Sequence, residues 1–335
     1  MKVGITFNLR KTFSERDSVF DSPKTIEDVK LALTSLGHRV KLYEADSETL
    51  FYMLKLDRPQ IVFNMAEGRY GIFGESFVPA LLDELRIPYT GSGVQGTLVA
   101  VNKVFTKLIL QSVGINVPKL YQVVNTLKEE IAQIDKFPVI VKPVFEGASI
   151  GIKSNSICYT KDEVEKVVYK LKERLGNRPI MIEEFIEGNE ITVGVMGNFP
   201  PKALPPMEID FSPLNKRELN ATNGIQTFTF KANYSEKANY YLPARFPSYI
   251  NTQIQEMAVK AFQILGLRDI ARFDVRVDKN FTPYFIEVNA VVGLEKEHSD
   301  FPRMYRMLGK DYNDLIKDIL DNALERVKNN VRINY

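Results

Sequence analysis

Two carboxylates, Asp274 and Glu287, are the residues whose type and spacing point most directly to chemistry. They lie in two segments of alternating polar and apolar residues, 271–278 and 283–289, with four residues between them. This pattern predicts a β-hairpin in which the two carboxylates face each other. Like charges opposed across two strands destabilise a hairpin unless a cation lies between them. Because Mg²⁺ is typically held by one or two carboxylates plus substrate phosphates, the pair predicts a magnesium site.

The register that we expect for this hairpin pairs Asp278 with Pro283 across the turn. Arg272 and Asn289 would then oppose each other on the same face as the acids, and the turn that follows would bring Gly293 beside them. The other face would carry apolar side chains: Phe273, Val275, Val277, Ile286 and Val288. The alternative is an exposed strand face on which charges alternate by chance, with arginines offsetting the acids.

A lysine and a loop of small residues, earlier in the chain, are suited to binding phosphate. Lys142 ends an apolar strand, where a buried ammonium needs an anionic partner. The loop Glu146–Gly151, which contains Ser149, offers backbone amides that can approach phosphate oxygens closely. Because the loop lacks the Walker pattern, a simple turn is the alternative at this point.

An acidic run, residues 183–190, follows the next predicted strand. Acidic residues at a strand end can accept hydrogen bonds from an exocyclic amine and from ribose hydroxyls, although a solvated charged face is the commoner explanation. The order of the pieces carries more information than any one of them. A lysine-ended strand, a small-residue loop, an acidic strand end and a carboxylate hairpin allow one nucleotide–metal site to be assembled.

The elements that must position these residues are typical of a mixed α/β protein. The first ninety residues alternate strand and helix, with strands near 3–7, 40–42 and 61–63, which predicts a Rossmann-like open sheet. No G-x-G-x-x-G follows the first strand, so NAD binding is disfavoured. The turn cluster 88–93 is the best candidate for a domain boundary.

The rest of the chain predicts helices and strands on either side of one long loop. Helices are expected up to about residue 113 and over 161–175, 254–265 and 312–327, and strands over 137–143, from 152 onward, over 180–183 and over 190–196. The segment 200–245 is polar and aromatic without a strong period, and we expect a long functional loop there. From these breaks we predict three domains, 1–92, 93–178 and 179–335.

The composition excludes several classes of protein. Hydrophobic residues make up 44% and charged residues 26%, as in globular proteins, and a formal net charge of +2 gives no field that favours nucleic acid or an anionic membrane. The single cysteine, Cys158, excludes an intrachain disulfide and fits a reducing compartment. Because no apolar run is long enough to span a membrane and no secretory leader opens the chain, we expect a cytoplasmic protein.

Taken together, these motifs resemble the ATP-grasp fold, and specifically the D-alanine–D-alanine ligases. The segments that carry the resemblance are Ile87–Ser92, Asn102–Lys107, Val141–Pro143 with Gly147–Gly151, Glu183–Ile186 with Glu190–Val195, Arg272–Val275 and Glu287–Asn289. They follow the family's order over nearly the whole chain. The resemblance implies an α/β protein, α+β in its ATP-binding part, in which an N-terminal Rossmann-like open sheet precedes two ATP-grasp subdomains.

The resemblance also implies a set of binding residues, with ATP lying between two antiparallel sheets. The nucleotide would be contacted by Lys103 and Lys142 at the phosphates, Glu183 at the adenine amine, Phe185 and Ile186 around the adenine and Glu190 at the ribose, with Ser149, Glu184 and Lys231 completing the site. Two Mg²⁺ ions, or Mn²⁺ in their place, would be held by Asp274, Glu287 and Asn289, with Glu287 bridging them.

The activity that the resemblance implies is ATP-dependent ligation of a carboxylate to an amine, in peptidoglycan biosynthesis. One amino acid is phosphorylated at its carboxylate, a second attacks through its amine, and a peptide bond forms with release of ADP and phosphate. Arg272 and the Gly293 amide would stabilise the oxyanion, and Glu15 would bind the first amino group. Phosphoryl transfer of this kind needs positioning and charge neutralisation rather than a protein nucleophile. The expected partners are small amino acids, with a homodimer left open and with neither nucleic acid nor membrane.

The sequence departs from the family mainly where the amino acids would bind. Glu67 stands in place of the family's histidine, Asn233 in place of the lysine of E-A-K-Y, and Glu295 in place of a threonine, while Lys231 lies close enough to replace the lost lysine. We hypothesise that the acceptor is not plain D-alanine and that Glu67 or Glu295 faces a cationic or larger amine. The alternative is that these acids point to solvent.

Two rival interpretations of function stay open beside the family's own reaction. One is a ligase for another amino acid or a small peptide. The other is a nucleotide-binding protein without ligase activity. Formation of ADP with a given amine, or ATP binding without ADP release, would distinguish them.

Overall fold

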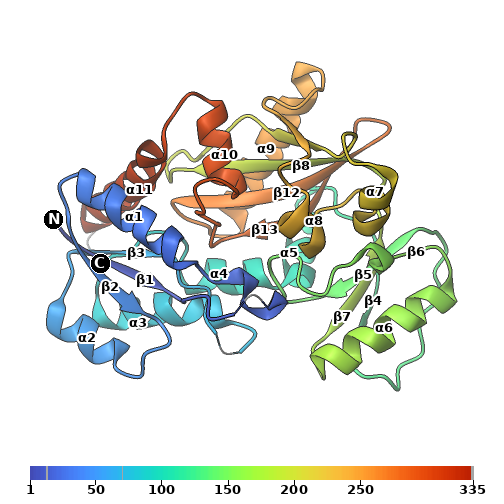
Figure 1. Cartoon of the computed structure of the whole chain (residues 1–335), viewed down its shortest axis with the longest axis horizontal. Helices are drawn as coiled ribbons and strands as arrows, with labels where there is room; N and C mark the ends of the chain where they lie inside the picture. The colour runs from blue at the N-terminus through green and yellow to red at the C-terminus, as the bar shows by residue number, and fades with distance from the viewer. Residues whose placement is uncertain (13, 70, 333–335) are drawn as a thin grey trace.

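The computed structural model describes residues 1–12, 14–69 and 71–332, so residues 333–335 of the predicted third domain lie outside the described residues. The described chain forms three sheets, with helices packed around them (Figure 1). None of its helices combines the length and the apolar character that crossing a membrane requires.

The N-terminal sheet is parallel, with strand order β2-β1-β3. Its strands are β1 (Lys2–Phe7), β2 (Arg39–Glu44) and β3 (Ile61–Asn64), and its helices are α1 (Pro23–Ser35), α2 (Leu50–Asp57) and α3 (Phe77–Leu85). α1 begins where the Ser22 side chain accepts a hydrogen bond from the Thr25 amide, as helix N-termini commonly do. The predicted alternation of strands and helices is thus confirmed.

A four-stranded antiparallel sheet with order β4-β7-β5-β6 forms the middle part. Its strands are β4 (Leu120–Val124), β5 (Val139–Pro143), β6 (Ile157–Cys158) and β7 (Ile180–Glu184), and α6 (Lys161–Leu175) packs against it (Figure 1). Two helices precede it, α4 (Val94–Val101) and α5 (Lys103–Ser112), where one helical stretch was predicted. The break lies at Asn102, which ends α4 and caps α5 by accepting from the Phe105 amide at 3.1 Å.

One prediction for this sheet needs correction, and the structure adds one strand. The strand expected from residue 152 onward is only Ile157–Cys158, because Ser154–Ser156 forms a 3₁₀ turn first. β4 was not predicted at all. β7 is hydrogen-bonded between β4 and β5, so a boundary after residue 178 separates a strand from its own sheet. We therefore propose that the boundary lies after Glu184.

The third sheet has the order β11-β10-β8-β12-β13, with β9 paired to β8. Its strands are β8 (Gly188–Met196), β9 (Lys202–Ala203), β10 (Met207–Asp210), β11 (Asn239–Tyr241), β12 (Ile270–Asp278) and β13 (Pro283–Asn289), followed by α10 (Asp300–Met307) and α11 (Tyr312–Arg332). Helix α9 (Ser248–Ile264) buries Ile254, Ala258 and Phe262 against it. α11 returns to lie beside α1, so the C-terminal helix completes the core of the N-terminal part (Figure 1).

The segment 200–245 is not the structureless loop that we predicted. It contains three short strands and two short helices, α7 (Lys216–Thr222) and α8 (Phe228–Asn233). Side chains of Asn215 and Thr227 cap these helices, and Phe230 packs in a small apolar cluster of its own. Elements this short carry too little hydrophobic periodicity to be detected from sequence.

The carboxylate hairpin forms as β12 and β13, but with a different register at its turn. Val277, not Asp278, pairs with Pro283, and a bulge beside Asp274 restores the predicted pairing of Asp274 with Glu287. The extra residue of the bulge is Ile286, which lines a cavity, so the prediction that it faces the core is wrong, and Phe285 takes that place in the core instead. A β-bulge inserts one residue into one strand and re-aims its side chains, as here.

Candidate active site

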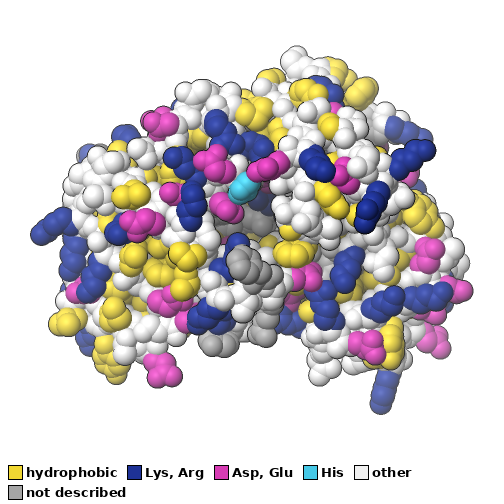
Figure 2. Space-filling view, in the orientation of Figure 1, with side chains coloured by type: hydrophobic (Ala, Val, Ile, Leu, Met, Phe, Trp, Pro, Cys, Tyr) yellow, Lys and Arg dark blue, Asp and Glu magenta, His cyan; other side chains and the backbone are white. Residues whose placement is uncertain are grey.

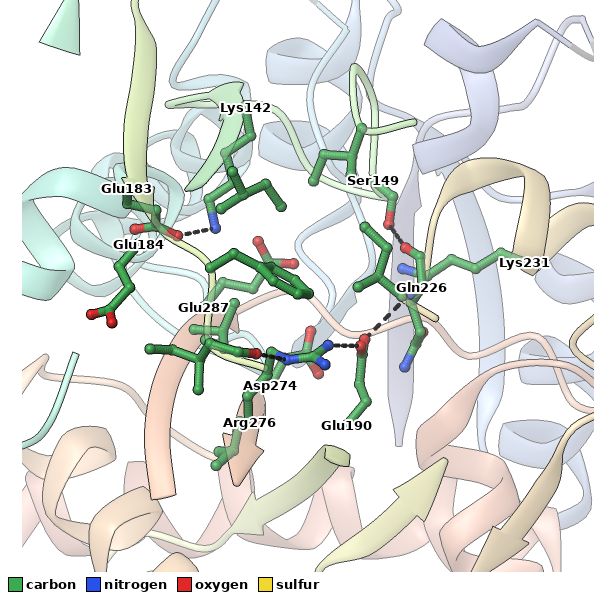
Figure 3. A pocket seen from close by; sticks show the side chains of 17 residues that line it. Lys142, Ser149, Glu183, Glu184, Glu190, Gln226, Lys231, Asp274, Arg276 and Glu287 are labelled. Atoms are coloured by element: carbon green, nitrogen blue, oxygen red, sulfur yellow. Dashed lines mark hydrogen bonds and ion pairs between the residues drawn. The ribbon is translucent and has the colours of Figure 1, made fainter. Parts of the chain in front are cut away.

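Two adjoining cavities lie where the three parts of the chain meet. The first lies between the two antiparallel sheets and is open to solvent, with about 660 Å³ of space that protein atoms do not fill (Figure 3). The second is larger, about 2160 Å³, and extends toward the N-terminal part. Gln226 and Lys231 line both cavities, so the two spaces meet beside these residues. Acidic and basic side chains gather around the hollow that opens on the surface (Figure 2).

Asp274 and Glu287 face the first cavity from neighbouring strands (Figure 3). Asp274 accepts hydrogen bonds from Arg272 Nη2 at 2.9 Å, Thr192 Oγ1 at 3.0 Å and Asn289 Nδ2 at 3.3 Å. The structure therefore brings together the four polar residues that the predicted hairpin set on one face.

Positively charged side chains surround the Glu287 carboxylate. Lys103 Nζ lies 3.7 Å from its Oε2. Burial alone would raise its pKa, but the positive charges of Lys103, Lys142, Lys231 and Arg272 outweigh burial and lower the pKa to about 2. Glu287 is therefore ionised at any pH at which the protein works.

The donor set at this point fits a hard divalent cation that also binds phosphate. The residues described in the structure contain no group of three His, Cys, Asp or Glu side chains placed to hold a metal. What they offer is two carboxylates with the Asn289 amide beside them. A magnesium ion usually takes one or two carboxylates from the protein and completes its shell with water and substrate phosphates.

The lysines lie on the side of the cavity that the middle sheet and α5 form. Lys142 Nζ pairs with Glu183 Oε1 at 2.7 Å, and Lys107 pairs with the other oxygen of the same carboxylate. Lys103 Nζ donates to the Glu146 carbonyl at 2.5 Å and lies behind Glu287. Burial lowers the pKa of Lys107 to about 7, while the negative charge of Glu183 opposes this loss of the proton.

Glu190 and the aromatic end of the cavity are organised by Arg276, which sequence reasoning did not assign. Its guanidinium donates to Glu190 Oε2 at 2.7 Å and to the carbonyl oxygens of Ile186 and Gly188 (Figure 3). It also stacks over the Phe185 ring at 4.8 Å. The signal was its place on β12, two residues beyond Asp274 on the same strand. Glu184 lines the same cavity and pairs with Lys136, whose side chain is exposed.

The loop of small residues is held in an unusual backbone conformation between the two cavities. Ala148 and Ser149 have φ of 48° and 60°, a left-handed conformation that costs non-glycine residues roughly 1–3 kcal/mol. Ser149 Oγ donates to the Gln226 carbonyl at 2.6 Å, which fixes the loop against the segment before α8 (Figure 3).

Glu15 lies behind this loop. Its Oε1 accepts from the Gly151 amide at 2.9 Å and its Oε2 pairs with Arg174 at 3.0 Å. Among the described residues, Glu15 is absent from the lining of both cavities, although Ser14 and Ser18 line the second. These contacts indicate that Glu15 holds the loop in place. They do not favour the predicted contact between Glu15 and an amino group of a substrate.

The second cavity contains the residues expected to act on the amino acids. Arg272 and Gly293 line it, and Arg272 also pairs with Asp300 at 3.5 Å. Glu295 lines it as well, whereas Glu67 is absent from the described lining of either cavity. Burial and the neighbouring Glu75 raise the pKa of Glu67 well above its usual value.

Lys231 rather than Asn233 supplies the cation of this segment. Lys231 lines both cavities, whereas Asn233 lines only the second. The charge of Lys231 is also one of those that lower the pKa of Glu287. A shift by two residues along α8 thus keeps a positive charge where the two cavities meet.

Asp21 in the second cavity predicts a measurable dependence of stability on pH. Burial raises its pKa from 3.8 to about 7, with Arg10 opposing and Glu295 adding to the rise. Between about pH 4 and pH 7 the unfolded chain loses this proton while the folded protein keeps it, so stability falls as pH rises. In Asp21→Asn, the loss of unfolding free energy between these pH values should be smaller than in the wild type by about 1–3 kcal/mol.

The measurement is the free energy of unfolding in urea at about pH 5 and pH 8. Asp28→Asn is the matched control, since Asp28 pairs with Lys24 on the surface of α1. Equal changes between the two pH values in wild type and Asp21→Asn would show that Asp21 does not titrate in this way.

Comparison with known proteins agrees with this geometry. A family model described as the D-ala D-ala ligase C-terminus matches residues 109–321. The D-alanine–D-alanine ligase of Aquifex aeolicus is 33% identical over 299 residues, 89% of this chain and 94% of that protein. The D-alanine–D-alanine ligase of Carboxydothermus hydrogenoformans is 30% identical over 334 residues, 97% of this chain and 99% of that protein.

The fold agrees as well. A crystal structure of D-alanine–D-alanine ligase from Bacillus anthracis complexed with ATP superimposes with a TM-score of 0.74 at 21% identity, over 98% of this chain and 99% of that one. The predicted ATP-grasp fold and the prediction of an ATP-dependent ligase are confirmed. The protein belongs to the D-alanine–D-alanine ligase family of ATP-dependent, peptide-bond-forming ligases.

Proposed function

We propose that the protein joins two D-alanine molecules, using ATP and Mg²⁺ and releasing ADP and phosphate. The observation that carries the proposal is the pair Asp274 and Glu287 in the first cavity, whose lining also includes Lys142 and Lys231, and Lys231 lines the second cavity as well. Negative charge must be neutralised where a phosphoryl group passes between a nucleotide and a carboxylate. Lys142 and Lys231, together with the cation that the two carboxylates would hold, would supply this positive charge.

The first cavity suits a nucleotide along its whole length. Ile140, Phe185 and Ile186 offer apolar walls for a purine, and Glu183 and Glu190 offer acceptors for its amine and for ribose hydroxyls. Lys142 and Ser149 lie on the side of the small-residue loop, where phosphates would be bound. Lys103 would act on the phosphates indirectly, through its contact with Glu287. Glu184 also lines the cavity and pairs with the exposed Lys136.

Asp274, Glu287 and Asn289 are the residues that would hold the magnesium ions. When bound, the metal neutralises charge that develops on the transferred phosphoryl group. Arg272 orients Asp274 through two hydrogen bonds, at 2.9 and 3.1 Å. Thr192 orients the same carboxylate from β8.

Arg272 and the Gly293 amide are our proposal for the groups that stabilise the oxyanion. Arg272 lines the second cavity while its guanidinium is held by Asp274 and Asp300, so it is preorganised. Glu15, through Gly151 and Arg174, fixes the loop that separates nucleotide from amino acid.

The setting of the reaction is also part of the proposal. We propose that the protein acts in the cytoplasm, where ATP is available. The buried free thiol of Cys158 is consistent with this reducing compartment. Peptidoglycan biosynthesis and a homodimer remain predictions that follow from the family.

A panel of amino acids tests this proposal. The protein is incubated with ATP, Mg²⁺ and single D- or L-amino acids, phosphate release is measured, and products are identified by mass spectrometry. We expect D-alanine to give the highest rate and D-alanyl-D-alanine as product. A larger or basic amino acid that outperforms D-alanine would support the alternative in which Glu295 faces the acceptor. ATP binding without ADP release under every condition would favour a binding protein.

A further inference from the structure

Lys107 is a buried lysine close to the first cavity that no role assigned so far requires. Its side chain is 5% exposed, and its Nζ pairs with Glu183 Oε2. The Glu183 side chain is 1% exposed, and its other oxygen pairs with Lys142 Nζ at 2.7 Å. The two carboxylate oxygens of one buried glutamate therefore each have a lysine of their own.

The two lysines differ in what they can reach. Lys142 lines the first cavity beside Glu183, whereas Lys107 is not among the described residues of that lining. Lys107 approaches from α5, one turn beyond Lys103, which faces Glu287 from the same helix. Helix α5 thus presents a cation behind each of the two carboxylates at positions i and i+4.

This arrangement matters when a triphosphate enters the cavity. Lys142 then has a second anionic partner and cannot serve both the phosphate and Glu183 with the same geometry. A buried carboxylate that loses its only cation either takes up a proton or costs several kcal/mol. Because Lys107 is not among the described residues of the cavity lining, we expect its pairing with Glu183 to persist when Lys142 turns to phosphate.

We propose that Lys107 is a positioning residue that keeps Glu183 ionised and oriented toward the purine, and thereby sets the preference for an adenine base. The inference rests on the proposed contact between Glu183 and the adenine amine. An ionised carboxylate accepts a hydrogen bond from the 6-amino group of ATP. ITP places a carbonyl oxygen at that position, which repels the carboxylate and cannot donate to it.

The test compares ATP with ITP in Lys107→Met, a substitution that keeps length and burial but removes the charge. Assays are run at about pH 6.5, below the pKa of Lys107, so that the wild-type lysine carries its proton. We expect KM for ATP to rise about tenfold, kcat to stay within about twofold, and the ATP-to-ITP ratio of kcat/KM to fall about tenfold.

Lys172→Met is the matched control. Lys172 lies on α6 and is 5% exposed, its Nζ donates to the carbonyl oxygens of Asn125 and Arg178 at 2.6 and 2.8 Å, and it is not among the described lining residues of either cavity. The same substitution there should lower the melting temperature but leave the ATP-to-ITP ratio unchanged. A purely structural role for Lys107 predicts the same behaviour for both variants.

Two further results bear on the proposal. Glu183→Gln should reduce the ratio as Lys107→Met does, and the double variant should reduce it no further, because both changes act on one contact. An unchanged ratio in folded Lys107→Met, or a loss confined to kcat, would overturn the proposal. If the wild type forms no ADP with any amino acid, the proposed ligase reaction fails, and calorimetric binding of ATP and ITP still decides the role of Lys107.

Discussion

Replacing Glu287 with glutamine is expected to lower kcat by about three orders of magnitude or more while the fold is retained. The substitution keeps the size of the side chain and removes one negative charge. In the wild type that charge is balanced by Lys103, Lys142, Lys231 and Arg272, which hold the pKa of Glu287 at about 2. An amide in its place leaves these cations repelling one another and removes one of the two carboxylates that would hold the magnesium ions in our proposal.

The measurement is ADP release as a function of Mg²⁺ concentration, with circular dichroism as the check of folding. The variant should also require more Mg²⁺ for half-maximal rate. Glu208→Gln is a matched control, because Glu208 is a buried glutamate of the same sheet whose partner is Arg245, at 2.8 Å. It should reduce stability and leave kcat within about threefold. Activity of Glu287→Gln within tenfold of wild type would contradict the metal assignment.

Asp269→Asn is expected to lower the free energy of unfolding by about 3–5 kcal/mol. The Asp269 side chain is fully buried and accepts four hydrogen bonds of 2.8–2.9 Å: from the Gly91 amide, from Asn198 Nδ2, and from Nε and Nη2 of Arg326. Asparagine fits the left-handed backbone, φ 63°, equally well. It removes the charge that compensates buried Arg326 and turns an NH₂ group toward these donors.

Urea unfolding followed by circular dichroism measures this effect. The double variant Asp269→Asn with Arg326→Met should recover part of the loss, because no uncompensated buried charge remains. If Asp269→Asn alone lowers the free energy of unfolding by less than about 1 kcal/mol, the pair Asp269–Arg326 does not hold the N-terminal part against the third sheet.

Asp269 also explains a motif whose purpose the sequence does not reveal. The Ile87–Ser92 segment contributes to neither cavity among the described lining residues. Instead the Gly91 amide donates to Asp269, and Ser92 Oγ accepts from the Arg268 amide at 3.2 Å. The motif joins the N-terminal part to the sheet that carries the carboxylates, and so positions the active site from a distance.

The sequence by itself determined the elements with a strong local signal and the chemistry of the site. Helix α6 has the bounds predicted for it, 161–175, and in the structure Thr160 caps its first turn while Gly176 follows its last residue, so its limits are set within one short segment. The opposition of Asp274 and Glu287 was predicted from alternation along two adjacent strands, and in the structure it also requires the bulge at Ile286. Such signals need only neighbours in the chain, so they can be read without knowing the fold.

The tertiary structure alone decided what depends on contacts between distant segments. The bulge at Ile286 is one such feature. Another is the pairing of Glu183 with Lys107 as well as with Lys142. A third is the contact of Glu15 with the small-residue loop, where a substrate contact was predicted. Burial and charge pairing set these arrangements, and both depend on which segments the fold brings together. The short elements of 200–245 also depend on such contacts. Caps and a small apolar cluster stabilise their helices, so the hydrophobic pattern of the sequence did not predict them.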